Sequence, residues 1–84
     1  MKYRKKQVVI EAFQIGFDVV PQWFMDRVGK DVETKNAEHS FVCFIKTIEG
    51  EMFAGYGDWI IKGVKDELYP CKADIFEMTY EAVL

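Results

Sequence analysis

Apolar positions in the first third of the chain predict one strand followed by one short helix. Residues 7–15 are rich in β-branched and aromatic side chains, as is typical of a strand, and Gly16 ends the run. Both faces of this strand are mostly apolar, which favours a central or doubly covered position. A helix is predicted from Pro21, which suits a first helical position, to Gly29, which suits a left-handed close. Its apolar stripe consists of Val20, Trp23, Phe24 and Val28.

The rest of the chain is predicted to be mainly β. Residues 30–40 are polar and charged, and we interpret them as a surface loop with room for a small amount of extended structure. Pro70 cannot donate to a ladder, so its strand ends there or lies at an edge. Residues 73–76 predict one helical turn. Strands are predicted over residues 41–48, 51–54, 58–63, 67–70 and 78–83, with turns at 49–50 and 65–66 and a loop at 55–57.

The order β-α-β-β-β-β-β predicts an α+β fold. We expect a single domain over residues 1–84, with a mainly antiparallel, twisted or partly rolled sheet of five to six strands and one short α-helix packed on it. A domain of this length buries only a modest fraction of its surface. Self-association as a homo-oligomer, or binding to a partner, would increase the buried area. No apolar run approaches the ~20 residues that span a bilayer, and no signal-peptide pattern is present. A soluble intracellular protein with no membrane partner is expected.

Charge is unevenly distributed along the chain. The formal net charge is −3, yet residues 1–6 carry four basic side chains and no acid. The remainder therefore holds 7 basic and 14 acidic residues, a net charge of −7. Such an acidic body argues against direct binding of nucleic acid, which needs many cationic contacts to phosphates. It fits a protein partner with a basic surface, because opposite potentials steer encounter. The alternative is an acidic surface that only keeps the protein soluble.

Residues that could carry chemistry are few. The chain has one histidine and no Ser/His/Asp or Cys/His arrangement of recognisable spacing, so we expect neither an enzyme nor a cofactor. The one metal candidate is a zinc site of His39, Cys43 and Cys71, because zinc binds imidazole and thiolate. In a straight strand His39 and Cys43 would lie about 13 Å apart, so a shared ion needs a bend at Ser40. The alternative is two thiols that act as small hydrophobic side chains.

Both ends of the sequence carry a resemblance to a known family. The segments are residues 3–12 (YRKKQVVIEA), the 47–51 hairpin (TIEGE) and residues 57–72 (GDWIIKGVKDELYPCK), followed by ADIFE and TYE. They are similar to a small family of proteins encoded by tailed phages and prophages of Gram-positive bacteria. The chain departs from that pattern at Gln7 and Ala73, where proline is usual, and at Asp66, where glycine is usual. The resemblance implies the cytoplasm of a bacterial host as the setting.

The resemblance also implies a class of function. Small phage accessory proteins often counter host immunity, and some are anti-CRISPR proteins that bind the effector nuclease. By this analogy we expect a non-enzymatic, anti-defence inhibitor that docks on a host defence protein, the CRISPR nuclease being the candidate. Two alternatives stay open: a sponge that sequesters a nucleotide immune signal, and a virion accessory or assembly protein.

Candidate contact residues for such a partner lie in turns and loops. The acids would face a basic surface, and an exposed aromatic side chain would anchor the interface. Phe17 and Tyr56 are the aromatic residues best placed to be exposed; the alternative for Tyr56 is a ring that folds back over the sheet. For a nucleotide sponge, Tyr56 or Trp59 would stack on the base, and Lys62, Lys65 or Arg4 would meet the phosphate. The predicted contacts to a protein partner are Glu49, Glu51, Tyr56, Asp58, Asp66 and Glu67.

Overall fold

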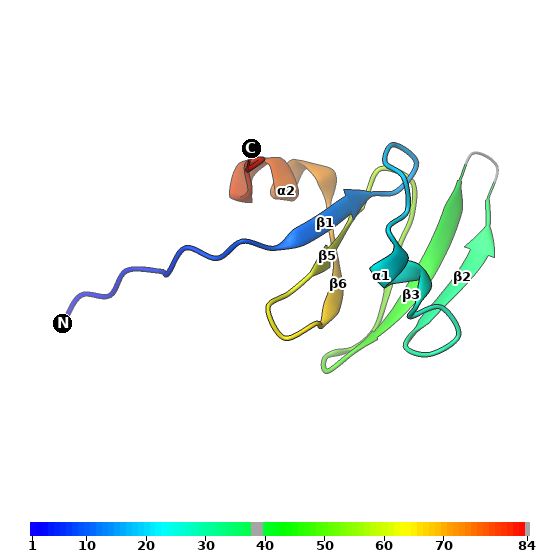
Figure 1. Ribbon diagram of the computed structural model, residues 1–84, viewed down its shortest axis with the longest axis horizontal. Helices are drawn as coiled ribbons and strands as arrows, with labels where there is room; N and C mark the ends of the chain where they lie inside the picture. The colour runs from blue at the N-terminus through cyan, green and yellow to red at the C-terminus, as the bar shows by residue number, and fades with distance from the viewer. Residues whose placement is uncertain (38–39, 84) are drawn as a thin grey trace.

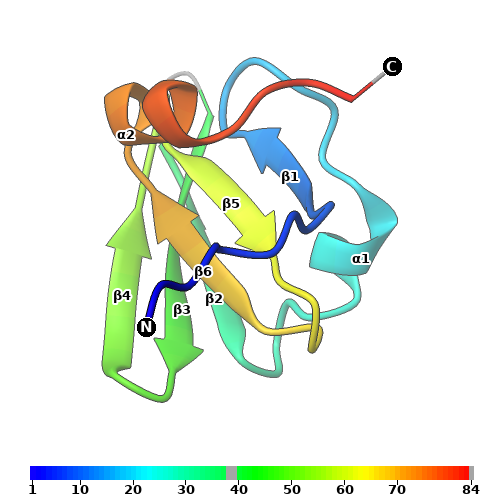
Figure 2. The same ribbon diagram turned by 90° about the vertical axis from the view of Figure 1, so that its left-hand side faces the viewer.

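The computed structural model describes residues 1–37 and 40–83, in which six antiparallel strands form two three-stranded sheets (Figures 1 and 2). The first sheet has the order β1-β5-β6, with β1 at Glu11–Gln14, β5 at Trp59–Lys62 and β6 at Leu68–Cys71. The second has the order β2-β3-β4, with β2 at Val32–Asn36, β3 at Phe41–Thr47 and β4 at Gly50–Ala54. The helices are α1 at Gln22–Met25 and α2 at Ala73–Thr79. The α+β class is confirmed. The predicted order β-α-β-β-β-β-β is also found, but with β2 in place of the strand predicted over residues 78–83, with two sheets in place of one and with a helix at the end.

The core lies between the two sheets and is closed by α1. Phe24 of α1 is 1% exposed, and Phe13 of β1 meets it edge-on with ring centroids 5.0 Å apart. The predicted stripe is confirmed, since Val20, Trp23 and Val28 pack against the same cluster. Burial of such side chains is the main stabilising contribution in a small domain. The cluster consists of Phe13, Ile15, Phe24, Val32, Cys43, Ile45, Ala54, Ile60 and Leu68.

The helix α1 is shorter than the spacing predicts. Pro21 precedes the helix as its N-cap residue, with extended backbone angles, and the helix ends at Met25. Gly29 nevertheless adopts the predicted left-handed conformation, with φ of +87°. Its N–H donates to the carbonyl of Val32 at 2.8 Å, which turns the chain into β2. Two residues of the stripe, Trp23 and Phe24, therefore lie in the helix, whereas Val20 and Val28 lie in irregular chain on either side of it.

The first strand is also shorter than predicted, and it lies at an edge. Its partner β5 ends at Lys62, where the chain turns back through Gly63 and Glu67. Within the described parts of the chain, no strand therefore lies beside residues 7–10. Residues 1–10 project from the body as an extended arm (Figure 1). The prediction of a central or doubly covered strand was wrong, because the apolar side chains of residues 8–10 remain largely outside the core.

Two further element predictions differ from the structure. Residues 32–36 lie in the segment predicted to be a surface loop with a small amount of extended structure, but they form the regular strand β2, in which buried Val32 lies opposite Ile45. The strand predicted over residues 78–83 does not form in the described chain, because α2 continues to Thr79. Phe76 and Tyr80 lie four residues apart, and together they cover the outer side of the first sheet. The rings of Trp59 and Phe76 stack at 3.9 Å and 5°, and Tyr80 follows 4.9 Å from Phe76.

Pro70 lies in the edge strand β6, as predicted. Within residues 1–37 and 40–83, no helix is long and apolar enough to cross a membrane.

Candidate binding surface

An exposed aromatic pair lies where the loop after β1 meets the loop between β4 and β5. The ring centroids of Phe17 and Tyr56 are 5.2 Å apart, and each residue is 61% exposed. The sequence-based expectation that these two aromatic side chains are exposed is confirmed. Val19, two residues after Phe17, is 92% exposed. Large apolar side chains held at the surface beside one another are typical of binding sites.

Hydrogen bonds fix the loop that carries Tyr56. The Asp58 carboxylate Oδ2 accepts from the Gly55 N–H at 3.0 Å, and the Asp58 N–H donates to the Gly55 carbonyl at 2.9 Å. The Gly57 N–H donates to the carbonyl of Ile15 at 2.9 Å, which ties this loop to the end of β1. Gly57 has a φ of +87°, a conformation that other residues rarely adopt. Tyr56 is therefore presented on a closed turn.

The loop that carries Phe17 is fixed in the same way. The N–H groups of Phe17 and Asp18 donate to the carbonyl of Gln14 at 3.2 and 3.0 Å. In return the Asp18 carboxylate Oδ2 accepts from the Gln14 N–H at 2.8 Å, and the Gln14 side-chain amide donates to the carbonyl of Gly57 at 3.0 Å. The two aromatic rings thus stand on two loops that are bonded internally and to one another. A partner would find them already ordered.

The six predicted contact residues do not form one surface. Glu49 and Glu51 lie in the β3–β4 hairpin, and Asp66 and Glu67 in the turn between β5 and β6. Both hairpin ends lie at the lower end of the molecule in Figure 1, whereas the loop 55–57 lies at the upper end. Tyr56 is thus separated from four of the acids. The acids and the aromatic pair belong to two ends of the domain.

Asp58 has a structural role in addition to any contact role. Its side chain is 14% exposed, and besides closing the loop it lies 3.5 Å from the Lys72 ammonium. The Asp58 carboxylate therefore joins the β4–β5 loop to the chain that enters α2. Burial at this level leaves little of the carboxylate for a partner.

Asp66 and Glu67 also have a structural role, because both accept hydrogen bonds that hold the β5–β6 turn. Asp66 has a φ of +62°, and its carbonyl accepts from Arg27 Nη1 at 2.7 Å. The Glu67 carboxylate accepts from the Lys65 N–H at 3.1 Å. Arg27 also binds Asp31 through two hydrogen bonds, and this contact lowers the pKa of the Asp31 carboxyl. The turn is therefore anchored to the segment between α1 and β2.

The predicted zinc ligands are placed only in part. Cys43 is fully buried, and burial, followed by the charge of Asp58, raises its pKa to about 11. Burial, followed by the charges of Asp74 and Asp58, also raises the pKa of Cys71, which is half-buried. Both surroundings favour the thiol, whereas zinc binds the thiolate. His39 lies outside the described residues, and among the described ones no three potential ligands come together.

The residues considered for a nucleotide largely have partners within the chain. One face of the Trp59 ring is stacked on Phe76. The Lys62 ammonium lies 5.8 Å from the centre of the Trp23 ring and 3.7 Å from the Asp66 carboxylate. Arg4 lies on the projecting arm, away from these groups. The structure therefore does not bring the predicted stacking and phosphate-binding residues to one place.

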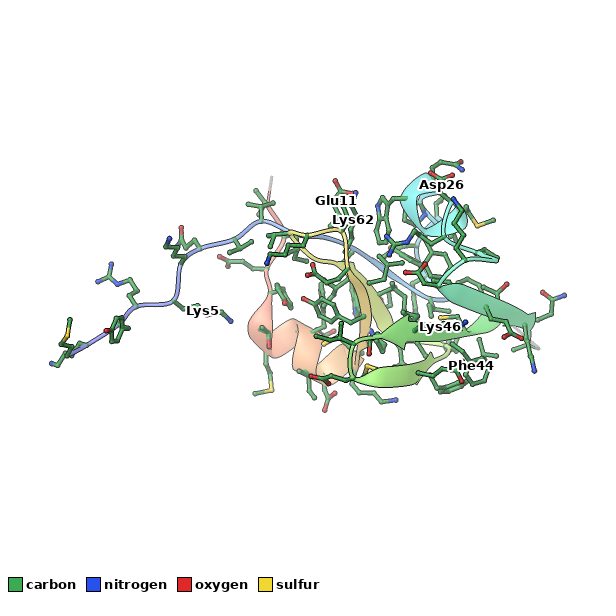
Figure 3. The ribbon with its side chains drawn as sticks, turned by 90° about the horizontal axis from the view of Figure 1, so that it is seen from below. Lys5, Glu11, Asp26, Phe44, Lys46 and Lys62 are labelled. Carbon is green, nitrogen blue, oxygen red and sulfur yellow. The ribbon has the colours of Figure 1, made fainter. Side chains whose placement is uncertain are left out.

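Sequence reasoning missed a second aromatic pair at the surface, in which Phe53 is exposed and Phe44 is half-buried. Phe44 and Phe53 lie opposite one another on the outer face of the second sheet, with ring centroids 5.4 Å apart, and Phe53 is 54% exposed. The Lys35 ammonium lies 5.8 Å from the centre of the Phe44 ring. Figure 3 shows Phe44 and Lys46 on this sheet. The sequence held no signal for this pair, because residues 41–45 are all apolar and do not show which face of the strand points outward.

Comparison of the chain with protein-family models, with curated proteins and with solved structures gives no match in any of the three. The resemblance carried by the two ends of the sequence therefore stays a prediction, and the candidate binding surface depends on the geometry described above.

Proposed function

We propose that this protein is a small non-enzymatic inhibitor that docks on a host defence protein, and that Phe17 and Tyr56 are its anchor. The single observation that carries the proposal is the exposed aromatic pair on two hydrogen-bonded loops. Aromatic side chains dominate the binding energy of many interfaces. Rings that are already held in place lose little conformational freedom on binding, so more of their contact energy appears as affinity.

Charge and setting support a particular kind of partner. The chain beyond residue 6 carries a net charge of −7, which favours encounter with a basic protein surface. Enzymes that bind nucleic acid present such surfaces. Together with the resemblance to phage proteins, this leads us to propose a CRISPR effector nuclease as the partner.

The proposal is tested with a purified RNA-guided nuclease. The protein is titrated into a DNA-cleavage reaction, and binding is followed by biolayer interferometry. We expect Phe17→Ala and Tyr56→Ala each to weaken binding and inhibition about tenfold or more, as hot-spot residues do. Phe53→Ala is the matched control, because Phe53 is an aromatic residue of similar exposure on a different face.

Thermal unfolding of each variant shows whether the fold is kept. Equal affinity of wild type, Phe17→Ala and Tyr56→Ala would exclude the aromatic pair as the anchor. If the nuclease neither binds the protein nor is inhibited by it at micromolar concentration, the proposed partner is wrong.

A further inference from the structure

The arm of residues 1–10 offers backbone groups that nothing in the described chain uses. None of these residues shares a backbone hydrogen bond with another described residue. The arm continues the line of β1 away from the body (Figure 1). Val8 is 52% and Val9 75% exposed, although both are strong strand formers. An extended apolar segment with free N–H and C=O groups is a template for strand pairing.

The free edge of this segment can be assigned residue by residue. The Ile15 N–H donates to the carbonyl of Asp58, next to β5, whereas the Gln14 N–H points the other way, to Asp18. Backbone groups alternate along a strand, so those of Ala12, Ile10 and Val8 point to the same side as Gln14. Among the described strands, β1 pairs with β5 alone, which leaves that outer edge open.

We propose that this edge pairs with the same edge of a second copy. The two arms run antiparallel about a two-fold axis at Val8, so that residues 4–12 of each copy form a two-stranded ribbon. The axis makes the contact self-complementary, as an isologous dimer requires. It joins the two β1-β5-β6 sheets end to end and forms about ten backbone hydrogen bonds, two for each hydrogen-bonded pair.

The charges along the segment favour one register. Opposed residues in an antiparallel pair must both point their backbone groups toward the partner or both away from it. With Val8 opposite Val8, Lys6 faces Ile10, and Lys5 faces Glu11. Lys5 and Glu11 then form a non-hydrogen-bonded pair, in which side chains come closest. Shifting the axis to Gln7 or Val9 places Tyr3 or Gln7 opposite Glu11 and loses this ion pair.

The surroundings of Glu11 fit this arrangement. Figure 3 shows Glu11 beside Lys62 at the start of β1, and Lys5 farther out on the arm. The Lys62 ammonium lies 4.0 Å from the Glu11 carboxylate. The Glu11 side chain is 63% exposed, so its carboxylate is open to a second cation. In the same register Lys2 of the second copy reaches Gln14, where the Asp18 carboxylate lies. In this register two lysines of the arm, Lys5 and Lys2, reach the Glu11 and Asp18 carboxylates of the second copy.

Exposed apolar side chains also lie beside the arm. The arm borders a groove of about 880 Å³ whose other walls come from the β5–β6 turn and the end of the chain. Val64 and Val83 in this groove are 69% and 73% exposed. An 84-residue domain that exposes this much apolar side chain at one end gains from a second copy there.

The first experiment measures the mass of the full chain by sedimentation equilibrium over a range of concentrations. We expect a monomer–dimer equilibrium. Lys5→Glu and Glu11→Lys should each raise the dimer dissociation constant about tenfold or more, because each creates two like-charge pairs across the axis. The double variant Lys5→Glu, Glu11→Lys should restore most of the affinity. Lys46→Glu, on the other sheet, is the charge-matched control (Figure 3).

A second experiment tests the register by cross-linking. In a Cys71→Ser background, Val8→Cys should form an intermolecular disulfide under mild oxidation, because opposed Cα atoms in such a pair lie within disulfide range. Val9→Cys, which faces Gln7, should not. A chain that stays monomeric at millimolar concentration overturns the proposal, as does a double variant that dimerises no better than the single ones. Neither result bears on the Phe17–Tyr56 anchor, which is tested on a separate target.

Discussion

The ring of Tyr56 lies directly over Gly16, so that a Cβ built at Gly16 would come within 2.5 Å of two ring carbons of Tyr56. Gly16 also has a φ of +90°, which side chains rarely allow. The glycine that ends β1 therefore does two things: it turns the chain, and it leaves space for the aromatic ring of the next loop. Position 16 links the backbone of one loop to the presentation of Tyr56 on the other.

Gly16→Ala is expected to destabilise the protein more than Gly29→Ala. Both glycines have a positive φ, but a Cβ at Gly29 meets nothing within 4 Å. Backbone strain alone costs about 1–2 kcal/mol, and displacement of Tyr56 adds to it at position 16, for about 2–4 kcal/mol in all. Urea unfolding of the two variants measures the difference. Equal losses would show that the Tyr56 ring moves aside without penalty.

Asp58→Ala is expected to lower the free energy of unfolding by about 1–3 kcal/mol. The substitution leaves the Gly55 N–H without its acceptor in a part-buried loop. Asp58→Asn keeps an oxygen at the same place and should lose less, mainly the contact with Lys72. Urea unfolding measures the free energy of unfolding, which should fall from wild type to Asp58→Asn to Asp58→Ala. If Asp58→Ala were as stable as wild type, the carboxylate would be free to serve as the contact residue that the sequence predicts.

The strands that could be predicted are those whose partners are close in sequence. The β3–β4 and β5–β6 hairpins follow from alternation and from turn residues at positions 50 and 66. The strand β2 could not be found from its composition, because Val32 is its only fully buried residue and the rest of its pattern is polar. The prediction for the end of the chain was wrong because residues 78–83 alternate as a strand does. In the structure, packing of the Phe76 ring on Trp59 stabilises the helix α2 instead. Contacts distant in sequence override local pattern there.

The candidate site was predictable residue by residue but not as a surface. Tyr56 and Phe17 follow strand ends and flank glycines, which indicates exposed loops, and both are exposed. That they contact one another depends on the bond between Gly57 and Ile15, which joins loops about forty residues apart. The acids at positions 49, 51, 66 and 67 were grouped with Tyr56 by charge and turn position alone. The sequence alone does not show that the β3–β4 and β5–β6 turns lie at the opposite end of the domain from the loop that carries Tyr56.

Asp66→Gly is expected to stabilise the protein by about 0.5–1 kcal/mol. Asp66 has a φ of +62°, which glycine adopts without the steric penalty of a Cβ. The hydrogen bond from Arg27 goes to the backbone carbonyl, so glycine keeps it. The lost ion pair with Lys62 is 3.7 Å long and its Asp66 carboxylate is exposed, so it contributes little. Lys65→Gly, in the same turn but without a positive φ, should instead destabilise by a similar amount. A lower melting temperature for Asp66→Gly would contradict this account.

Cys71 is expected to react with thiol reagents in the folded protein, whereas Cys43 is not. Cys43 is 0% exposed, and its raised pKa keeps it protonated near neutral pH. Cys71 is half-buried at the end of β6. Iodoacetamide labelling with mass spectrometry should therefore modify one thiol in native protein and both in urea. Asp58→Asn should speed the labelling of Cys71, since the Asp58 charge contributes to its raised pKa. Labelling of Cys43 at the same rate would show that the core opens locally.

Alkaline pH is expected to destabilise the protein through two groups, buried Cys43 and half-buried Tyr69. The pKa of Cys43 is raised from 9.0 to about 11, chiefly by burial. The pKa of Tyr69 is raised from 10.0 to about 12 by burial and then by the neighbouring Tyr80. Above pH 9 the unfolded chain releases these protons before the folded one does. The unfolded state then binds fewer protons, so the free energy of unfolding falls as pH rises.

The loss should begin near pH 9 with Cys43 and continue to about pH 12 with Tyr69. A shift of two pKa units sets an upper limit of about 3 kcal/mol for the buried thiol. Urea unfolding at pH 8, 9, 10 and 11 measures the slope. Tyr69→Phe should be less sensitive to pH above 10 than wild type, because it has no phenol to ionise there. Tyr3→Phe, on the exposed arm, controls for removal of a hydroxyl group. A wild-type stability that is flat from pH 8 to 11 would mean that neither group stays protonated because of the fold.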